Sequence, residues 1–331
     1  MSKHRMRRKP GAAESAHRSG FVSILGRPNV GKSTLLNALV GEKIAIVTAK
    51  PQTTRALIQG VWTSDAAQIV LLDTPGIHDA SSLINRRMMK SLSTALDERD
   101  LLLFVVDATR EPRPEDRQAV EWIKRSQAPA FVVLNKIDLL RDRDALLPLT
   151  AAYKEWHEFE EFFPVSAHTG DGLEELRSGV VARLPAGPPY FPADYLTDQP
   201  ERFLLAETIR EKVLLLTRQE VPHSVAVTID AWEELPRLAR VSATIHVERP
   251  GQKPIVVGAA GTRLKQIGTQ ARIDAEKLLG KKLFLQLFVK VSENWREREE
   301  FLNELDWRTA GLAAGPSHTS GEAGGGHNEG S

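Results

Sequence analysis

Short apolar segments alternate with longer amphipathic ones through the first half of the chain. Four segments have strand length and are mostly apolar: FVSIL at residues 21–25, QIVLLD at 68–73, LLLFVVD at 101–107 and FVVLN at 131–135. Continuous apolar runs of this kind are typical of parallel strands that helices cover on both faces. We therefore predict an α/β domain over residues 21–184, with a doubly wound and mainly parallel sheet.

A different pattern follows a Pro- and Gly-rich stretch that we interpret as a linker at residues 185–201. Apolar residues at helical spacing run from about Arg202 to Leu216, and strand-like segments follow at Ser224–Ile229 and Val241–Val247. A third apolar run at Ile255–Val257 is expected to be a strand, and glycine-punctuated helices lead to a last strand at Leu283–Val291. This order predicts a smaller α+β domain over residues 202–307.

The two ends of the chain have compositions that do not support a packed core. Residues 1–20 are basic and broken by Pro and Gly, and residues 308–331 are Gly-rich and of low complexity. We predict a disordered basic arm at residues 1–20 and a disordered tail at residues 308–331.

Composition excludes several classes of protein. The 331 residues include no cysteine, which excludes disulfides and thiolate metal sites, and 41% are hydrophobic, enough for one large core or two modest ones. The longest apolar runs are far shorter than a membrane span. We expect a soluble, cytoplasmic protein.

Charge is distributed unevenly along the chain. Residues 1–20 carry six Lys or Arg and one Glu, and residues 249–291 carry nine basic and two acidic residues. The whole chain has a formal net charge of +1, so the remainder is strongly acidic. Such segregation suggests that part of the molecule binds an acidic partner, although a solvated basic face is the alternative.

The segment GRPNVGKS at residues 26–33 matches the phosphate-binding loop pattern between a predicted strand and a predicted helix. In this pattern the backbone N–H groups wrap the phosphates, and the helix N-terminus adds positive potential. Lys32 is expected to reach the β- and γ-phosphates, and Ser33 to provide a hydroxyl to Mg²⁺. The predicted phosphate-binding residues are Gly26, Arg27, Pro28, Asn29, Val30, Gly31, Lys32, Ser33 and Thr34.

A second nucleotide motif ends the strand QIVLLD. Asp73 is suited to hold Mg²⁺ through water, and the N–H of Gly76 can sense the γ-phosphate, while Thr74 and Pro75 complete DTPG. The same four residues also form ordinary turns, so the motif gains its meaning from its position some forty residues after the phosphate loop.

The third and fourth motifs address the base. Asn135, Lys136 and Asp138 close the strand FVVLN, and the Asp138 carboxylate can accept both N1–H and the exocyclic amine of guanine. Adenine would leave that carboxylate unpaired, so the motif predicts GTP over ATP. Ser166 and Ala167 fit the loop whose backbone N–H meets the guanine carbonyl.

These motifs resemble those of the Era family, within the translation-factor class of GTPases. The resemblance lies in GRPNVGKS, PQTTR, DTPG, NKID and SAH, in this order, and the similarity covers about residues 21–307. It implies that Thr54, with Thr53 as the alternative, is the switch I threonine that binds Mg²⁺ when a γ-phosphate is present. Lys32, Thr54 and Gly76 are then the expected catalytic residues.

Two further positions bear on hydrolysis. Ile77 occupies the place where Ras-like proteins have a water-orienting Gln, which predicts slow intrinsic hydrolysis or help from another group. Asn29 resembles the Asn with which related GTPases hold K⁺ beside the phosphates, or else it braces its loop. His78 is expected to be an exposed loop residue rather than a base.

The segment IVVGAAGTRLKQIG at residues 255–268 contains a GxxG turn followed by a helix, as in a type II KH RNA-binding domain. The central positions of GxxG are alanines, so we expect backbone N–H groups to contact phosphates, with charge supplied by lysine and arginine. The predicted RNA-binding residues are Lys253, Gly258, Ala259, Ala260, Gly261, Arg263 and Lys265.

The resemblance implies GTP and GDP as ligands, and the 3′ region of small-subunit ribosomal RNA and the small ribosomal subunit as partners. It also implies a role in small-subunit maturation and some peripheral association with a membrane. Two alternatives stay open: a signalling GTPase whose C-terminal domain binds a protein, and a GTP-dependent subunit of an RNA-modifying enzyme.

Overall fold

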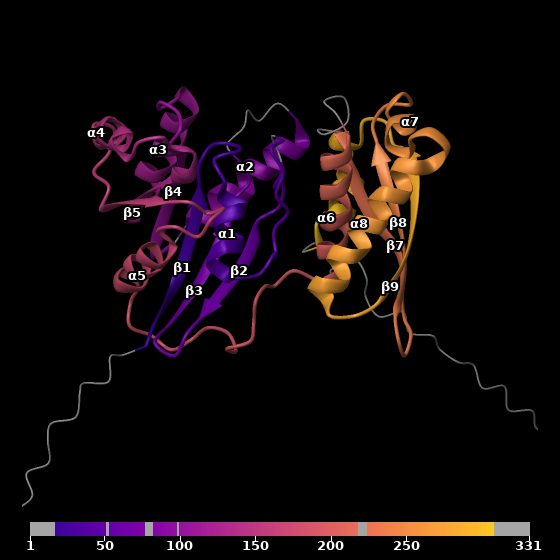
Figure 1. Cartoon of the computed structure of the whole chain (residues 1–331), viewed down its shortest axis with the longest axis horizontal. Helices are drawn as coiled ribbons and strands as arrows, with labels where there is room; N and C mark the ends of the chain where they lie inside the picture. The colour runs from indigo at the N-terminus through magenta and orange to yellow at the C-terminus, as the bar shows by residue number, and fades with distance from the viewer. Residues whose placement is uncertain (1–16, 51–52, 77–81, 98, 218–223, 308–331) are drawn as a thin grey trace, which may run out of the picture.

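The computed structural model describes residues 17–50, 53–76, 82–97, 99–217 and 224–307, which form two domains side by side (Figure 1). In these residues no helix combines the length and the apolar character needed to cross a bilayer.

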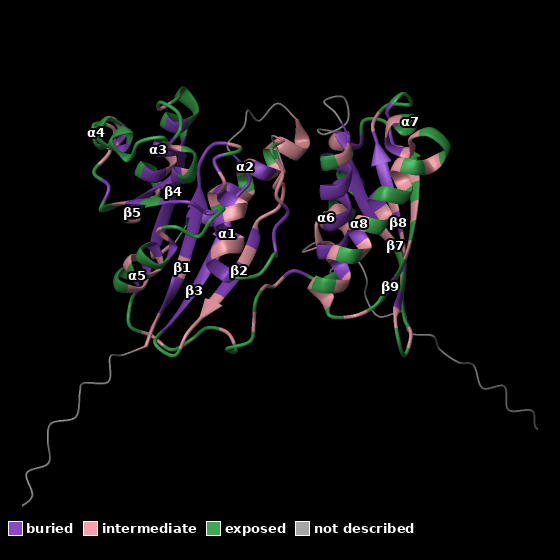
Figure 2. Cartoon of the chain, in the orientation of Figure 1, coloured by how far each residue is buried: buried purple, intermediate pink, exposed green. Residues whose placement is uncertain are grey.

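The first domain contains a six-stranded sheet in the order β2-β3-β1-β4-β5-β6. Only β2 is antiparallel to its neighbour, so the predicted mainly parallel sheet is confirmed. The strands are β1 (Arg18–Leu25), β2 (Ile58–Thr63), β3 (Ala67–Asp73), β4 (Leu101–Asp107), β5 (Ala130–Asn135) and β6 (Glu161–Val165). Every residue of β3, β4 and β5 is buried, as expected for strands with helices on both faces (Figure 2).

Helices cover both faces of this sheet. Leu35 and Leu36 of α1 and Leu176 of α5 pack on one face, while Leu92 of α2 and Val120 of α3 pack on the other with residues of α4. The helices are α1 (Lys32–Val40), α2 (Leu83–Leu96), α3 (Pro114–Ser126), α4 (Leu146–Lys154) and α5 (Leu173–Arg183), with short 3₁₀ turns η1 (Ile137–Leu139) and η2 (Arg143–Ala145).

The linker lies against the first domain. The backbone N–H of Val61, in the edge strand β2, donates to the carbonyl of Leu196 at 2.8 Å, and Thr197 Oγ1 donates to the carbonyl of Gln59 at 2.6 Å. Its beginning pairs with the start of β1 through an isolated bridge between Arg18 and Ala186. Because β1 begins at Arg18, residues 18–20 belong to the sheet and not to the arm predicted at residues 1–20. The other described residue of that arm is His17, whose Nδ1 donates to the carbonyl of Gly187 at 2.9 Å.

The second domain is a three-stranded sheet with α6 and α8 on one face and η5 and α9 against part of the other, around Ala226. Its order is β7-β8-β9, with β7 and β8 antiparallel and β8 and β9 parallel. Leu205 and Ile209 of α6 and Ile267 and Ala271 of α8 pack on Val241 and its neighbours. The elements are α6 (Glu201–Leu216), β7 (Ala226–Glu234), β8 (Ala239–Val247), α7 (Gln252–Val257), η4 (Ala259–Gly261), α8 (Thr262–Leu279), β9 (Leu283–Val291), η5 (Trp295–Glu297) and α9 (Glu299–Leu305).

One predicted strand is wrong. The run Ile255–Val257 lies in α7, which begins after Gly251 and carries Pro254 in its first turn, where a proline is tolerated because the N–H there needs no helical partner. Val256 is buried, so the apolar run reflects one buried helical turn and not a strand. The remaining predicted elements of this domain lie where the pattern placed them, within a few residues.

The two domains contact each other through α6, α2 and α9. Helix α6 lies on the side of the second domain that faces the first (Figure 1). The loop after α1 donates to it twice, from Lys43 Nζ to Glu211 Oε2 at 2.6 Å and from the Val47 N–H to Glu211 Oε1 at 2.9 Å. An apolar cluster around Trp295 packs against Leu83 and Ile84 of α2.

Candidate nucleotide site and nucleic-acid interface

The loop between β1 and α1 has a backbone that requires glycine. Gly31 has φ 103°, and a Cβ there would lie 2.3 Å from Asn135 Nδ2. That amide donates to the carbonyl of Val30 at 2.8 Å and thereby ties the loop to the end of β5. The loop lines a hollow of about 420 Å³, its open mouth included, to which Pro28, Thr34 and Gly76 also contribute.

Lys32 lies at the centre of this loop. Its ammonium is buried and donates to the carbonyls of Gly26 at 3.0 Å and Arg27 at 3.2 Å. Burial lowers its pKa to about 8, although Asp73 opposes the shift. A buried cation at the N-terminus of α1 is the arrangement expected for binding phosphate groups.

Three oxygen ligands meet beside Lys32. Ser33 Oγ lies 2.6 Å from Asp73 Oδ2 and 2.7 Å from Thr54 Oγ1, and Thr54 Oγ1 lies 3.3 Å from the same carboxylate oxygen. Asp73 is fully buried, and its Oδ1 has no hydrogen-bond partner among the described residues. Burial raises the pKa of Asp73, so this carboxylate needs a positive charge. Hydroxyl and carboxylate oxygens in this arrangement fit Mg²⁺.

The alternative switch I residue, Thr53, faces elsewhere. Its hydroxyl lies 2.7 Å from Thr48 Oγ1 and donates to the carbonyl of Lys50 at 2.7 Å, so it braces its own loop. This arrangement favours Thr54 over Thr53 as the cation ligand.

The rest of the DTPG motif at residues 73–76 is buried. The Thr74 hydroxyl donates to the carbonyl of Ile24 at 2.7 Å, and Thr74, Pro75 and Gly76 are all buried. Ile77 and His78 lie outside the described residues.

The residues predicted to recognise the base lie together at the ends of β5 and β6. Asn135 Oδ1 accepts from the Ala167 N–H at 3.0 Å, which joins the two strand ends. Asp138 Oδ1 accepts from Ser166 Oγ at 2.7 Å, and the Asp138 residue is exposed toward solvent. A carboxylate held on a rigid turn and open to solvent can accept two N–H groups from one edge of guanine.

Lys136 belongs to a network that no sequence motif indicated. Its Nζ donates to Asp107 Oδ2 at 2.7 Å and to the carbonyl of Asn29 at 2.8 Å. Burial opposes ionisation of Asp107, but the bonds from Lys136 and Thr109 hold its pKa below the ordinary value. Asp107 is the last residue of a buried strand, as Asp73 is. This shared position was the one feature of the sequence that could have indicated a role for Asp107 at the site.

A buried ion pair supports the phosphate loop from the other side. Arg27 Nε lies 3.3 Å from Asp116 Oδ1 of α3, and both side chains are largely shielded from solvent. No sequence pattern marks this pair, because Asp116 resembles any acidic residue in the first turn of a helix. Asn29, at the tip of the loop, has φ 64° and its Nδ2 donates to the carbonyl of Ala49 at 3.0 Å.

The GxxG segment of the second domain forms a tight turn between α7 and α8. Gly258 has φ 73°, and a Cβ there would lie 3.0 Å from the backbone nitrogen of Arg263. Ala260 also lies in the left-handed region, at φ 48°, and both central alanines are exposed. The turn thus presents backbone rather than side chains to a ligand.

A groove of about 740 Å³, open solvent at its mouth included, lies beside this turn, between α8 and the edge strand β9. Its floor is apolar, with Leu264 and Leu287, and it carries Lys265 and Arg272. Arg263 does not line it, because its guanidinium is half-buried and donates to the carbonyl of Ile255. Lys253 is exposed on α7 and Gly261 lies at the mouth of the groove. An apolar floor with basic walls suits single-stranded nucleic acid.

Comparisons with known proteins match both domains. Residues 21–136 match the family described as 50S ribosome-binding GTPase, and residues 220–296 match the KH domain. The chain is 49% identical over 303 residues to GTPase Era of Syntrophus aciditrophicus (strain SB). These aligned residues make up 91% of this chain and 99% of that protein. The chain belongs to the Era GTPase family. Era of Geobacter metallireducens (strain ATCC 53774 / DSM 7210 / GS-15) is 50% identical over 297 residues, 89% of this chain and 99% of that one.

Solved Era structures share the whole two-domain arrangement. A single-substitution variant of Aquifex aeolicus Era bound to GDP·AlF₄⁻ has 41% sequence identity and a TM-score of 0.85, covering 87% of this chain and 99% of that one. Era in complex with MgGDPNP and nucleotides 1506–1542 of 16S ribosomal RNA gives the same identity and TM-score, with 88% and 99% covered. The fold predicted from the Era resemblance, a P-loop GTPase domain followed by a KH domain, is therefore confirmed.

Proposed function

We propose that this chain is a GTP-hydrolysing switch that binds small-subunit ribosomal RNA near its 3′ end and assists assembly of the small ribosomal subunit. The observation that carries this proposal is the likeness of both domains, at a TM-score of 0.85, to an Era bound to nucleotides 1506–1542 of 16S ribosomal RNA. The basic groove beside the GxxG turn supports it. The KH match disfavours the alternative of a signalling GTPase whose second domain binds a protein.

In the proposed reaction, water attacks the γ-phosphate of GTP in line with the leaving oxygen. Lys32 leaves the loop carbonyls to bind the β- and γ-phosphates, whose negative charge further stabilises the ammonium that burial disfavours. The Gly76 N–H donates to the γ-phosphate. Asp138 and Ser166 hold the guanine edge, and Asn135 and Lys136 brace the loop beneath it.

The oxygen cluster of Ser33, Thr54 and Asp73 would hold Mg²⁺, Asp73 through a water molecule. The ion would neutralise the charge that develops on the phosphate oxygens. We further propose that Asn29 holds K⁺ beside the phosphates, in place of bracing Ala49. Hydrolysis rates measured in KCl and in NaCl test this, and equal rates would contradict it.

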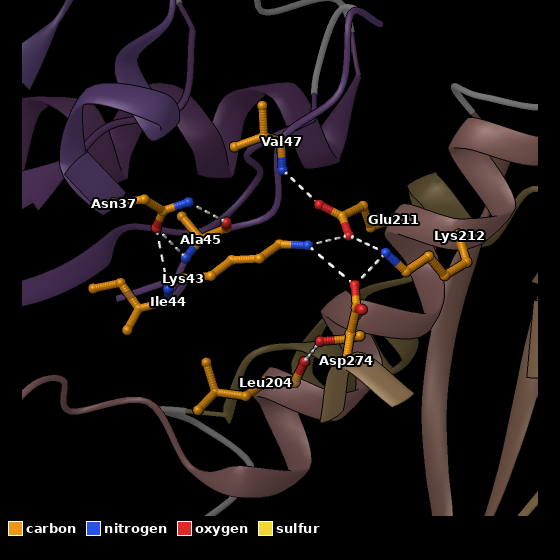
Figure 3. Close-up of polar contacts among 10 residues, drawn as sticks. Asn37, Lys43, Ile44, Ala45, Val47, Leu204, Glu211, Lys212 and Asp274 are labelled. Atoms are coloured by element: carbon orange, nitrogen blue, oxygen red, sulfur yellow. Dashed lines mark hydrogen bonds and ion pairs between the residues drawn. The ribbon is translucent and has the colours of Figure 1, made fainter. Parts of the chain in front are cut away.

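The nucleotide state would reach the RNA groove through α6. The Val47 N–H and Lys43 both donate to Glu211, and Lys212 next to it pairs with Asp274 on α8, the helix that follows the GxxG turn (Figure 3). Movement of the loop that carries Val47 and Thr54 would therefore change how the second domain presents its groove.

The decisive experiment measures binding of an RNA equivalent to nucleotides 1506–1542 of 16S ribosomal RNA against a scrambled RNA of the same composition. Each is titrated in a salt series with GDP or with a non-hydrolysable GTP analogue. A preference for the ribosomal sequence that is stronger with the analogue supports the proposal. Equal binding of both RNAs that disappears with salt reflects electrostatic attraction alone and overturns the ribosomal assignment.

The proposal also includes a cytoplasmic location with some peripheral association at the inner face of the membrane. Flotation of the full chain with vesicles of phosphatidylethanolamine and phosphatidylglycerol tests this association. Protein that stays at the bottom of the gradient at low salt would remove the membrane from the proposal.

A further inference from the structure

Two phenylalanines are exposed on the face of the KH sheet that α6 and α8 leave uncovered. Phe284 is 49% and Phe288 55% exposed, and both lie on the edge strand β9. Because side chains alternate between the two faces of a strand, Leu285 and Leu287 line the groove beside α8 while the phenylalanines lie on the opposite face. A sheet face that is open to solvent normally carries polar side chains, so two aromatic rings in such positions need an explanation.

The part of this face that other elements cover ends before the phenylalanines. Trp295 and Phe301 of η5 and α9 pack around the start of β7, and the Phe301 ring contacts His246 of β8. Phe288 and Phe284 lie beyond that end, and among the described residues neither ring contacts another aromatic ring. They are four residues and about 13 Å apart along the strand, too far to stack on each other.

Polar groups lie between and beside the two rings. Gln286 separates them on β9, with Ser242 opposite it on β8, and Lys290 follows Phe288 on the same face. In the part of the chain that the structure describes, the side chains of Gln286, Ser242 and Lys290 form no hydrogen bond and no ion pair. An amide, a hydroxyl and an ammonium group are therefore available to a ligand that lies on the rings. We call Phe284, Gln286, Phe288 and Lys290 the open face of β9.

The acidic residues nearby already have partners. Asp230 accepts hydrogen bonds from Thr228 Oγ1 at 3.0 Å and from Thr244 Oγ1 at 2.7 Å. Glu233 forms an ion pair with Arg240 at 3.2 Å. The charge of Lys290 is not matched in this way, so the open face favours a ligand that carries negative charge.

The open face and the RNA groove are the two sides of one strand. Leu285 and Leu287 belong to the groove, and their neighbours Phe284 and Phe288 belong to the open face. Because β9 is the edge of its sheet, a single strand of RNA that leaves the groove can pass around this edge and continue on the other side. Exposed aromatic rings on a sheet, with polar groups between them, are also how other RNA-binding domains hold unpaired bases.

We propose that the open face of β9 is a second RNA-binding surface, on which Phe284 and Phe288 each stack one base of the single strand that leaves the groove. Gln286 and Ser242 form hydrogen bonds with base edges, and Lys290 contacts a phosphate. The inference rests on the proposed binding of RNA in the groove beside the GxxG turn, and it extends that binding site to the opposite side of the sheet.

Fluorescence anisotropy with labelled RNA equivalent to nucleotides 1506–1542 of 16S ribosomal RNA tests the surface, with the full-length protein saturated with a non-hydrolysable GTP analogue. Phe284→Ser and Phe288→Ser should each weaken binding about tenfold, as the loss of one stacked base predicts. Leu215→Ser is the matched control, since Leu215 is 54% exposed on α6, and it should bind the RNA like the wild type. All three variants should keep the wild-type affinity for GDP.

Two further substitutions of Phe288 distinguish base stacking from a merely apolar contact. Phe288→Trp keeps a flat aromatic ring and should bind the RNA within about threefold of the wild type. Phe288→Leu keeps an apolar side chain without a ring and should lose about as much affinity as Phe288→Ser. If the leucine variant binds as tightly as the wild type, the rings do not stack bases and the proposal is wrong.

Shorter RNA separates the open face from the groove. One GxxG loop clamps about four nucleotides, so fragments of the same RNA of about six nucleotides should occupy the groove alone. The two serine variants should bind these fragments like the wild type, whereas Lys265→Ala should weaken the fragments and the full RNA alike.

The outcomes distinguish a failure of the open face from a failure of the groove. If Lys265→Ala weakens binding but both serine variants bind the full RNA normally, the groove stands and the second surface is refuted. If those serine variants also no longer sediment with small ribosomal subunits, the open face binds a protein instead. If Lys265→Ala and the serine variants all bind normally, the groove is refuted and the second surface with it.

Discussion

Glu211 Oε1 accepts a 2.9 Å hydrogen bond from the backbone N–H of Val47, which joins a helix of the KH domain to the loop beside the nucleotide pocket. The other oxygen of the same carboxylate binds Lys43 at 2.6 Å and Lys212 at 2.9 Å. Both lysines also contact Asp274 (Figure 3). A carboxylate with 2% side-chain exposure thus holds Lys43 and the Val47 N–H across the domain boundary, and Lys212 on its own helix.

Replacing Glu211 by Ala should destabilise the protein by about 3 kcal/mol, because the buried Lys212 loses one of its two carboxylate partners and the Val47 N–H loses its acceptor. Urea denaturation followed by circular dichroism measures the change. Glu233→Ala, which removes an ion pair with Arg240 in which both side chains are 56% exposed, is the control and should cost less than about 0.5 kcal/mol. If both variants lose the same free energy of unfolding, the Glu211 contacts stabilise the protein no more than an exposed ion pair does.

Asp138→Asn should weaken GDP binding by about a hundredfold, because an amide cannot accept both guanine N–H groups. Xanthosine diphosphate, which offers one N–H and one carbonyl on that edge, should bind the variant better than GDP. Fluorescence competition with both nucleotides measures this. Asp65→Asn removes the same charge at an exposed turn and should bind GDP like the wild type; an unchanged GDP affinity in Asp138→Asn would contradict the assigned role.

His246 should make the KH domain less stable as the pH falls from about 6.5 to about 4. Burial lowers its pKa to about 4, with Asp230 opposing and Lys290 adding to the shift, and its ring lies 3.0 Å from Thr228 Oγ1 and 2.9 Å from Ser292 Oγ. The unfolded chain binds a proton in this range and the folded one does not, so stability present above pH ~6.5 is lost below it, by at most about 3 kcal/mol.

The test of this pH dependence compares His246→Gln with wild type in urea denaturation at pH ~4.5 and pH ~7, on either side of most of the transition. The variant should lose less stability than wild type on acidification. His168→Gln, at an exposed position, should behave like wild type. An identical loss in wild type and His246→Gln would assign the acid sensitivity to other groups.

Lys265→Ala should weaken RNA binding at low salt and reduce the slope of log affinity against log salt by about 0.7, the value for one phosphate contact with a single strand. Lys265 lines the groove, whereas Lys277 is exposed on the same helix and does not. Filter binding with Lys277→Ala as the control measures both slopes. An equal reduction in both variants would mean that the helix contributes only general charge.

Much of the first domain was predictable because its signals are local. Four central strands are mostly apolar runs, and the nucleotide motifs follow from backbone and ligand chemistry. Strand β2 was missed, since IQGVWT contains a glycine and mixes polar with apolar residues. Gly60 leaves room for tertiary packing, since a Cβ there would lie 2.6 Å from the Ile44 side chain, which would have to shift.

The domain junction could not be predicted for a related reason. Arg210, Glu211 and Lys212 are consecutive charged residues of a helix, a pattern that normally indicates a solvated face. All three are buried, because their partners include segments far away in the sequence. Likewise, the run Ile255–Val257 is rich in β-branched residues, yet it follows Gly251 and Pro254 in a short helix.

The hydrogen bonds of Leu196 and Thr197 to β2 make most of the predicted linker a fixed part of the GTPase domain. Only residues 198–200 remain between that anchor and the start of α6 at Glu201. A segment of this length can span no more than about 10 Å. The KH domain is therefore closely tethered: while these bonds hold, it can pivot about Thr197, near the start of β2, but it stays within reach of the GTPase domain.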